Sequence, residues 1–291
     1  MKYALHGITL ALPFSCPELP PSEEEADVEA GWGKIDAPSA DWNEEGVCFK
    51  AAPGRYLLSV QGVADFLVED GRKITIEPHP EGEQERIRLH FFGEVMAALL
   101  WARGNLVARG CVVEKEGKGI AFVGPSPCGK TMTAAWLASR GFRVVSDGFF
   151  SLDGNGMAMP GSPRLMLWEK SLEKLGISRE GLVPVRSGMN RFYLPLENSF
   201  SREPVRLESI FVISFRNGPG LSVVRAKGAK KMFSILDNRY RPELAAPFGT
   251  VEISARIAAT VAKRAEVGIF GYNDTLLPFA EYAELLLGEM S

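Results

Sequence analysis

The residues with the clearest potential for chemistry are GPSPCGKT, at positions 124–131. Gly124, Gly129, Lys130 and Thr131 satisfy the pattern G-x-x-x-x-G-K-[S/T] of phosphate-binding loops. In such a loop, backbone N–H groups at the start of a helix point at the phosphates, and the lysine adds a positive charge. The hydroxyl side chain that follows binds magnesium. The pattern therefore predicts a nucleotide site, and the alternative is a Gly-Lys turn that merely opens a helix.

Two prolines alter this loop, because proline has no backbone N–H to donate. Pro125 comes early, where a missing donor matters little, but Pro127 lies closer to the expected phosphates. We still predict that the main chain at Ser126 and Cys128 contributes to phosphate binding. We expect altered phosphate contacts, and binding in preference to fast catalysis.

The elements around the loop are those that a phosphate-binding loop requires. Apolar periodicity predicts a helix over residues 91–104, strands over 106–114 and 119–123, and a helix over 131–141. A buried strand over 142–147 then ends at Asp147. Strand, glycine-rich loop, helix and strand form the unit in which such loops occur.

The rest of the chain indicates a mixed α/β protein. Residues 1–90 read as a β-rich N-terminal region, with strands over 56–60, 65–68 and 73–77 and a turn at 69–71. Within the second part, residues 91–291, a hairpin is expected around 153–154. Further strands are expected over 207–217 and 220–226, with a turn at 218–220 between them. Helices are expected over 171–176, 251–265 and 276–287.

Composition excludes several classes of function. The 291-residue chain is 46% hydrophobic and 24% charged, which is typical of a globular protein with an ample core. Its formal net charge of −3 gives no reason to expect nucleic acid or an anionic membrane as a partner. No apolar run approaches the roughly 18 residues of a membrane span. A basic cluster is interpreted as solvated surface: Arg225, Lys227, Lys230 and Lys231.

The cysteines and the N-terminus indicate a cytoplasmic protein. The four cysteines are scattered, without a C-x-x-C pair or a neighbouring histidine: Cys16, Cys48, Cys111 and Cys128. This spacing argues against a zinc site and against a disulfide framework, and it fits reduced thiols. The apolar N-terminal run is interrupted by His6 and shortened by Pro13, so we expect a first strand and not a secretory signal.

The segments GKGIAFVGPSPCGKT and RGFRVVSD together resemble the core of the HPr serine kinase/phosphorylase family. The continuation LDGNGMAMPGSPRLMLWEKSLEKLG is similar to the HPr-kinase-like serine kinases of bacteria, and weaker likeness extends to DFLVEDGRKITIEP and NRYRPEL. The resemblance implies a phosphoenolpyruvate carboxykinase/HPr kinase-like P-loop domain over residues 91–291. Its sharp motifs lie between positions 109 and 175.

The resemblance also implies roles for individual residues. Lys130 and Thr131 match the lysine and hydroxyl residue that hold ATP and Mg²⁺. The family carries two adjacent aspartates after the next strand, one assisting proton transfer from the acceptor serine and one helping with the metal. Here the pair is Asp147-Gly148, so one carboxylate is absent. The family's His-Gly pair aligns with Arg109-Gly110, and its glycine-rich, glutamate-bearing second motif has no clear match.

These departures leave alternatives open. Asp147 is either catalytic and metal-binding or a structural carboxylate at the strand end. Arg109 either neutralises phosphate or lies on a strand surface. Arg164 and Arg191 are candidate phosphate contacts, for which we prefer a solvated or salt-bridged arginine.

Three functions follow from these alternatives. The first, which we prefer, is an ATP-dependent serine kinase that acts on an unidentified protein or peptide acceptor. The second is a nucleotide- or phosphate-binding sensor that kept the loop and lost catalysis, and the third is a scaffold with an empty loop. The sequence leaves open ATP against GTP and whether the protein forms a homo-oligomer, as some relatives do.

Overall fold

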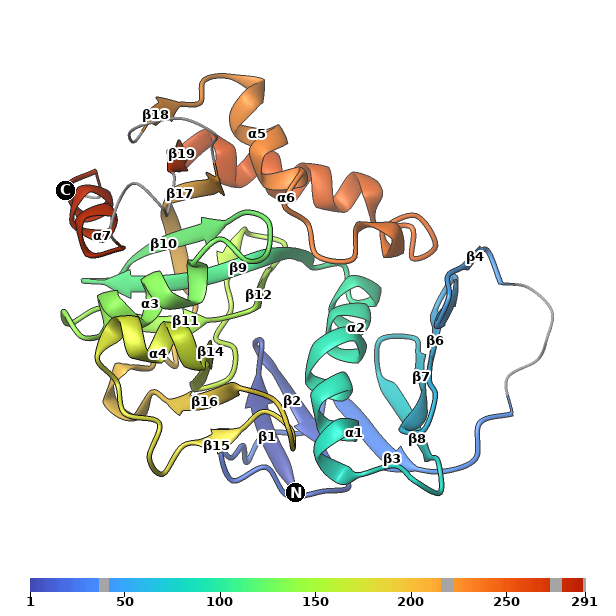
Figure 1. The fold of residues 1–291 in the computed structure, drawn as a ribbon. Coiled ribbons are helices and arrows are strands. Elements are labelled where there is room, and N and C mark those ends of the chain that lie inside the picture. Colours follow the sequence, from blue (N-terminus) through green and yellow to red (C-terminus); the bar gives the residue numbers. More distant parts are fainter. Residues whose placement is uncertain (37–41, 216–221, 273–278, 290–291) are drawn as a thin grey trace. The chain divides into compact units, whose positions relative to one another are not determined.

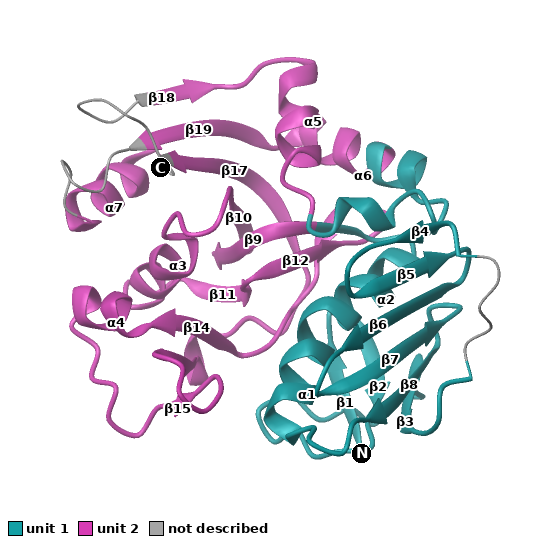
Figure 2. Ribbon diagram, turned by 45° about the vertical axis from the view of Figure 1, so that its right-hand side comes forward, with its two compact units in different colours: residues 1–107, 240–255 teal, residues 108–239, 256–291 magenta. Residues whose placement is uncertain are grey.

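The computed structural model describes residues 1–36, 42–215, 222–272 and 279–289, which form a mixed α/β fold with several sheets. The chain divides into two compact units, coloured separately in Figure 2. Unit 1 comprises Met1–Val107 and Tyr240–Ala255, and unit 2 comprises Ala108–Arg239 and Arg256–Ser291. The predicted mixed α/β class is therefore confirmed.

Unit 1 is built on an eight-stranded sheet in the order β1-β2-β3-β8-β7-β6-β5-β4. Its strands are β1 (Lys2–Leu5), β2 (Ile8–Ala11), β3 (Val28–Trp32), β4 (Glu44–Glu45), β5 (Phe49–Ala52), β6 (Arg55–Val60), β7 (Ala64–Glu69) and β8 (Lys73–Pro78). The pairs β2–β3 and β3–β8 are parallel, and the remaining neighbours are antiparallel. The turn predicted between β7 and β8 is confirmed, because Asp70 and Gly71 both have positive φ, as a tight hairpin requires.

One continuous helical segment packs on this sheet. It consists of α1 (Gln84–His90), a π-helical turn η1 (Phe91–Val95) and α2 (Met96–Ala102). Unit 1 also contains a separate 3₁₀ turn, η3 (Pro242–Leu244). The helix thus begins before the predicted residue 91. The buried ring of Phe91 contacts Phe14 edge to face, with centroids 5.5 Å apart. Because this helical segment completes the core of unit 1, the two units divide after Val107, whereas the sequence suggested a division at residue 90.

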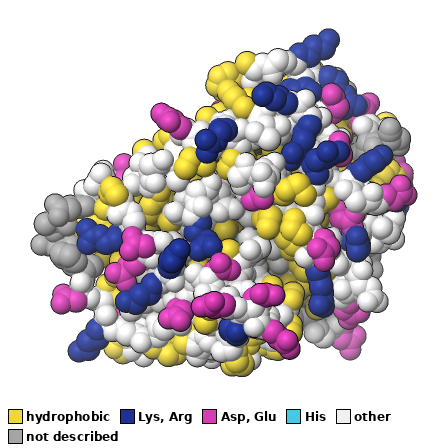
Figure 3. Space-filling model, turned by 180° about the vertical axis from the view of Figure 1, so that it is seen from behind, with side chains coloured by type: hydrophobic (Ala, Val, Ile, Leu, Met, Phe, Trp, Pro, Cys, Tyr) yellow, Lys and Arg dark blue, Asp and Glu magenta, His cyan; other side chains and the backbone are white. Residues whose placement is uncertain are grey.

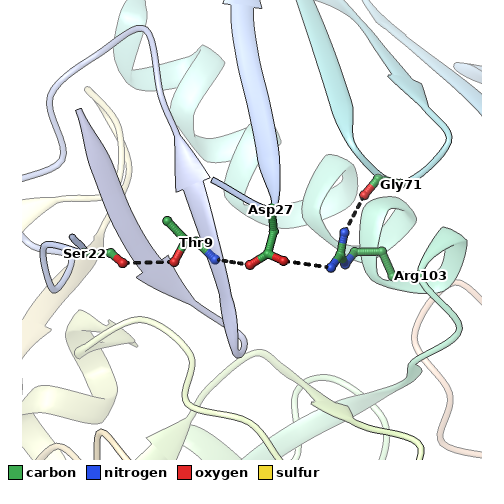
Figure 4. A network of polar contacts seen from close by, with 5 residues as sticks. All are labelled: Thr9, Ser22, Asp27, Gly71 and Arg103. Atoms are coloured by element: carbon green, nitrogen blue, oxygen red, sulfur yellow. Dashed lines mark hydrogen bonds and ion pairs between the residues drawn. The ribbon is translucent and has the colours of Figure 1, made fainter. Parts of the chain in front are cut away.

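A polar network joins the C-terminal end of α2 to the strands of unit 1 (Figure 4). Arg103 donates to the carbonyl of Gly71 at 2.9 Å and forms an ion pair with Asp27 at 3.3 Å. The same carboxylate accepts from the backbone N–H of Thr9 at 2.9 Å, and the Thr9 hydroxyl meets that of Ser22. The network fixes residue 103 within unit 1.

Unit 2 contains a second eight-stranded sheet, in the order β10-β9-β12-β13-β17-β19-β18, with β11 beside β9 (Figure 1). Its strands are β9 (Leu106–Lys115), β10 (Lys118–Val123), β11 (Arg143–Ser146), β12 (Phe149–Leu152), β13 (Met157–Ala158), β17 (Val205–Phe215), β18 (Ser222–Arg225) and β19 (Glu266–Tyr272). Strand β10 pairs with β9 antiparallel and with β17 parallel. The hairpin predicted around 153–154 is confirmed by the pairing of β12 with β13.

Helices and aromatic side chains form the core of unit 2. The helices are α3 (Lys130–Ala138), α4 (Glu169–Leu175), α5 (Ala229–Leu236), α6 (Val251–Arg264, which begins in unit 1), α7 (Phe279–Gly288) and the 3₁₀ turn η2 (Glu197–Ser199). Four buried rings make successive contacts at centroid distances of 5.8, 5.5 and 6.4 Å: Phe122, Phe211, Phe270 and Tyr282. Burying a phenylalanine contributes roughly 1.5–3 kcal/mol, so this row firmly anchors the strands that carry the 124–131 loop.

A small antiparallel sheet lies beside α3 and α4 in unit 2. It has the order β14-β16-β15 and consists of β14 (Arg164–Trp168), β15 (Val183–Pro184) and β16 (Arg191–Pro195). In β14, Leu165 and Leu167 are buried in the core of unit 2, whereas Trp168 is exposed. This alternation is the pattern of a strand with one buried face.

Some sequence predictions fall outside the described residues. The turn expected at 218–220 lies there, as do the first residues of the helix expected over 276–287, whose described part is α7. In the described ranges, no helix combines the length and apolar character that a membrane crossing needs. Figure 3 shows basic and acidic side chains interspersed over the face seen from behind.

Candidate functional site

The loop 124–129 connects the end of β10 to the start of α3 within unit 2. Gly124 is buried with φ of +143°, and a Cβ added there would lie 2.2 Å from the carbonyl oxygen of Ile213 in β17. Gly129 has φ of +81° at the N-cap of α3. Glycine alone satisfies the close approach at 124 without displacing the neighbouring strand. The predicted strand–loop–helix unit is thus confirmed as structure.

The first turn of α3 directs backbone donors towards this loop. Thr133 N–H bonds to the Gly129 carbonyl at 2.8 Å, and the N–H groups that precede it in a helix have no intrahelical acceptor. These groups carry the partial positive charge of a helix N-terminus. At the tip of the loop, Pro125, Ser126 and Pro127 are exposed. An anion could therefore approach the first turn from solvent.

The ammonium group of Lys130 is folded over the loop. Nζ donates to the carbonyl oxygens of Pro125 at 2.7 Å and of Gly124 at 3.0 Å, and it lies 3.4 Å from Cys128 Sγ. Within the described part of the chain, no carboxylate pairs with this lysine. The positive charge thus remains at the loop, uncompensated by an acid, where a phosphate would need it.

The hydroxyl of Thr131 contacts the carboxylate of Asp147. Thr131 Oγ1 donates to Asp147 Oδ1 at 2.8 Å, although the two residues are 16 positions apart in sequence. Asp147 follows β11, which pairs with β9 next to β10. The other carboxylate oxygen accepts a longer, 3.4 Å bond from Met166 N–H. Two residues that the sequence predicted for metal binding are therefore adjacent in the structure.

Several groups act on the ionisation of Asp147. Burial raises the pKa of this carboxyl above its usual range, because the charged form loses hydration. The hydrogen bond from Thr131 and the N–H groups of Met166 and Gly148 lower the pKa, since they stabilise the carboxylate. The positive charge of Arg191 acts in the same lowering direction. Burial prevails, so the pKa of Asp147 lies above that of an exposed aspartate.

Two buried thiols line the loop. Cys111 Sγ donates to the Lys130 carbonyl at 3.3 Å, and Cys128 contacts the Lys130 ammonium group. Burial raises the pKa of both thiols, well above the ordinary value for Cys111, although the positive charge of Lys130 lowers the pKa of each. At neutral pH both are protonated, so they serve packing and not nucleophilic chemistry.

Arg109 lies in β9, directly before Gly110. Gly110 is paired with Val123 at the end of β10, and its N–H bonds to the Gly148 carbonyl at 3.2 Å. A Cβ added at Gly110 would lie 2.2 Å from the Phe122 carbonyl oxygen, which accounts for the glycine. The Arg109 side chain is half-buried. The Arg109-Gly110 pair therefore belongs to the same end of the sheet as the loop.

The sheet that borders Asp147 is not predicted from the sequence. There, Arg164 and Arg191 are expected to be phosphate contacts or solvated or salt-bridged side chains, whereas in the structure they lie in β14 and β16. Arg191 Nε donates to the Met166 carbonyl at 3.3 Å, and Arg164 stacks over the Tyr193 ring at 3.8 Å. The alternation R-L-M-L-W over 164–168 is a strand signal that could have identified β14.

The residues present suit a magnesium–phosphate complex better than a metal site made by protein alone. Among the described residues, no group of three or more histidine, cysteine, aspartate or glutamate side chains could hold a metal ion. Mg²⁺ usually takes one or two protein ligands and completes its shell with phosphate oxygens and water. Thr131 Oγ1 and Asp147 Oδ1 fit that requirement, because they are adjacent and Thr131 lies in the first turn of α3.

No protein-family model and no curated protein matches this sequence. The geometry of the loop and of Asp147 therefore carries the functional argument.

Proposed function

We propose that unit 2 is a phosphoenolpyruvate carboxykinase/HPr kinase-like P-loop domain that binds ATP with Mg²⁺ and transfers its γ-phosphoryl group to a serine of a protein or peptide. The 2.8 Å contact between Thr131 and Asp147 carries the proposal, since it joins a hydroxyl at the helix start to a carboxylate at the next strand end. Lys130, held at the loop, supports it. This pairing is what a metal-bound nucleotide requires of a protein.

Each residue then has a defined task. The N–H groups at the start of α3 and the Lys130 ammonium group bind the phosphates, which requires Lys130 to exchange the Gly124 and Pro125 carbonyls for phosphate oxygens. Thr131 and Asp147 would hold Mg²⁺, which supplies charge stabilisation for the transferred group. Arg109 contributes further positive charge at this end of the sheet.

Asp147 also serves as the general base. It accepts the proton of the serine hydroxyl while the serine oxygen bonds to the γ-phosphorus and the bond from that phosphorus to the β-phosphate oxygen of ATP breaks, releasing ADP.

Nucleotide binding is tested by thermal unfolding. Mg-ADP at one hundred times its Kd adds about 2.7 kcal/mol to the free energy of unfolding, which raises Tm by about 4 °C in a protein of this size. Lys130→Ala should abolish the increase. Lys118→Ala, at the opposite end of β10 and exposed, is the matched control and should keep it. An unchanged Tm for the wild type at millimolar nucleotide would refute the proposal.

Phosphoryl transfer is tested with γ-labelled ATP and serine peptides. Label should appear on serine in the wild type and disappear in Asp147→Asn.

One observation favours a second candidate, a nucleotide-binding sensor without catalysis. The position after Asp147 is Gly148, so among the described residues at this strand end only one carboxylate faces the loop. Nucleotide binding without label transfer to any peptide would assign the protein to this class.

A further inference from the structure

Arg191 is linked to Asp147 through the main chain of a single residue. Arg191 Nε donates to the Met166 carbonyl at 3.3 Å, and the Met166 N–H donates to Asp147 Oδ2 at 3.4 Å. The guanidinium and the carboxylate therefore both bind the central residue of β14. Any change in how Arg191 holds Met166 is passed on to this carboxylate.

Strand β16 fixes the position of the Arg191 side chain. Arg191 begins this strand and pairs with Trp168, the last residue of β14. Its guanidinium lies over the Trp168 ring, 5.6 Å from the ring centroid. A guanidinium that stacks by its flat face keeps its edge N–H groups for hydrogen bonds. Stacking on Trp168 and bonding to Met166 are thus compatible, and together they order the side chain.

The charge of Arg191 acts on the same carboxylate. Burial raises the pKa of Asp147, and the positive charge of Arg191 is among the influences that lower it. Arg191 is half-buried, and none of the ion pairs between described residues includes it. Arg191 therefore favours the ionised form of Asp147, which is the form that binds a metal ion.

The two oxygens of Asp147 have different partners. Oδ1 accepts from Thr131 Oγ1 at 2.8 Å, and Oδ2 accepts from the Met166 N–H. Holding Oδ2 at β14 keeps Oδ1 next to the hydroxyl with which it would share Mg²⁺. Carboxylates that bind metal ions are themselves hydrogen-bonded, and losing such an outer partner typically weakens metal binding about 10- to 100-fold.

We propose that Arg191 is a positioning residue for Asp147, and that it holds Oδ1 of this carboxylate in the orientation that binds Mg²⁺ next to Thr131. The inference rests on the proposed function, because it concerns the metal ion that accompanies the nucleotide. Arg191 acts through Met166 and through its charge, without a contact of its own to the metal.

A purely structural role for Arg191 makes a different prediction. If the guanidinium only packs on Trp168, its loss loosens the small sheet and lowers stability without a specific effect on metal binding. The two roles differ in whether the effect of removing Arg191 depends on Mg²⁺ and on the carboxylate of Asp147.

The first measurement compares ADP binding in Mg²⁺ and in EDTA by isothermal titration calorimetry. Methionine is a long side chain that can still pack on Trp168, but it has neither the charge nor the N–H donor. Arg191→Met should therefore weaken ADP binding in Mg²⁺ on the order of tenfold and leave binding in EDTA unchanged. An Arg191→Met variant with the full magnesium dependence of the wild type would overturn the inference.

The second measurement needs no nucleotide. Urea unfolding of the wild type, Arg191→Met, Asp147→Asn and the double variant forms a double-mutant cycle. Because Arg191 acts on the carboxylate, Arg191→Met should lower the urea midpoint more in the wild type than in the Asp147→Asn background. Equal shifts in the two backgrounds would show that Arg191 acts independently of Asp147, against the inference.

Arg140→Met is the matched control. The Arg140 guanidinium also stacks on a tryptophan of unit 2, 3.6 Å from the Trp136 ring centroid, but it pairs with Glu284. This variant should keep the magnesium dependence of the wild type, and it should shift the urea midpoint equally in both backgrounds. A loss of magnesium dependence equal to that of Arg191→Met would overturn the inference.

The same samples separate this inference from the proposed function. If the wild type binds ADP more tightly with Mg²⁺ and Arg191→Met keeps that gain, the positioning role is wrong and nucleotide binding stands. If the wild type binds ADP neither with Mg²⁺ nor with EDTA, the proposed function is wrong, and the role of Arg191 in metal binding fails with it.

Discussion

Thr131 and Asp147 form a 2.8 Å hydrogen bond between the first turn of α3 and the end of β11. The hydroxyl donates and the carboxylate accepts. A magnesium ion bound by both oxygens would replace this proton-mediated contact with two metal–oxygen bonds. Under the proposed function, this contact is lost when Mg²⁺ and nucleotide bind.

Removing the Thr131 hydroxyl should abolish the contribution of magnesium to nucleotide binding. In Thr131→Val, we expect ADP affinity to become equal with Mg²⁺ and with EDTA, whereas the wild type should gain about tenfold or more from the metal, because a metal ligand is lost. Isothermal titration calorimetry measures both affinities. Thr133→Val is the control. Thr133 lies two residues after Thr131 in the same helix, and its hydroxyl donates to the Gly129 carbonyl. Retained magnesium dependence in Thr131→Val would contradict the assignment.

The raised pKa of Asp147 should appear in the pH dependence of stability. Above the usual value of 3.8 and below the raised value, the folded protein holds more protons than the unfolded chain. The contribution of this group to the free energy of unfolding therefore falls as pH rises through that window, by up to about 1.4 kcal/mol per pH unit. Asparagine does not titrate. The free energy of unfolding of Asp147→Asn minus that of the wild type should thus increase from about pH 4 upwards.

Urea unfolding at a series of pH values measures this difference. Only its change with pH is diagnostic, because replacing a carboxylate oxygen that faces Met166 N–H also shifts stability by a constant amount. The exposed Asp237→Asn substitution provides the comparison. A difference between Asp147→Asn and wild type that stays constant with pH would show that burial does not perturb this carboxyl.

Local sequence patterns predicted the elements that carry the loop. A buried strand, a Gly-Lys-Thr start and an apolar helix are adjacent in sequence, so β10 and α3 follow from residues within a short window. The position of Asp147 could be predicted because this residue ends the strand that follows α3. The roles of these residues, in contrast, stay predictions until nucleotide binding is measured.

Tertiary pairing determined what the sequence could not predict. Met166 reaches Asp147 only because β14 pairs with β16, whose residue Arg191 lies 25 positions further along the chain. Neither strand is long, and no local signal connects them. Likewise, the helix that begins at Gln84 has a polar first turn, and its place in unit 1 depends on contacts such as Phe91 with Phe14.

Gly124→Ala should destabilise the protein and impair the loop. The added Cβ would lie 2.2 Å from the Ile213 carbonyl oxygen, at a φ that side chains rarely adopt. The strain should lower the free energy of unfolding by roughly 1–3 kcal/mol. Gly154→Ala is the control, because a Cβ there meets no described heavy atom within 4 Å. Equal stability of the two variants in urea would show that the approach of β17 to the loop is looser than described.

Restoring a second carboxylate next to Asp147 should increase phosphoryl transfer. Gly148 has φ of +82°, which aspartate tolerates better than most residues, and an added Cβ would meet Met166 Cε at an ordinary 3.8 Å. Gly148→Asp should therefore fold with a loss of about 1 kcal/mol and supply the metal-binding acid that the family resemblance implies. We expect the magnesium-dependent rate of label transfer to serine to rise on the order of tenfold. Gly148→Asn has the same backbone requirement without the charge, so an equal rise in that variant, or no rise in Gly148→Asp, would show that the missing carboxylate is not what limits catalysis.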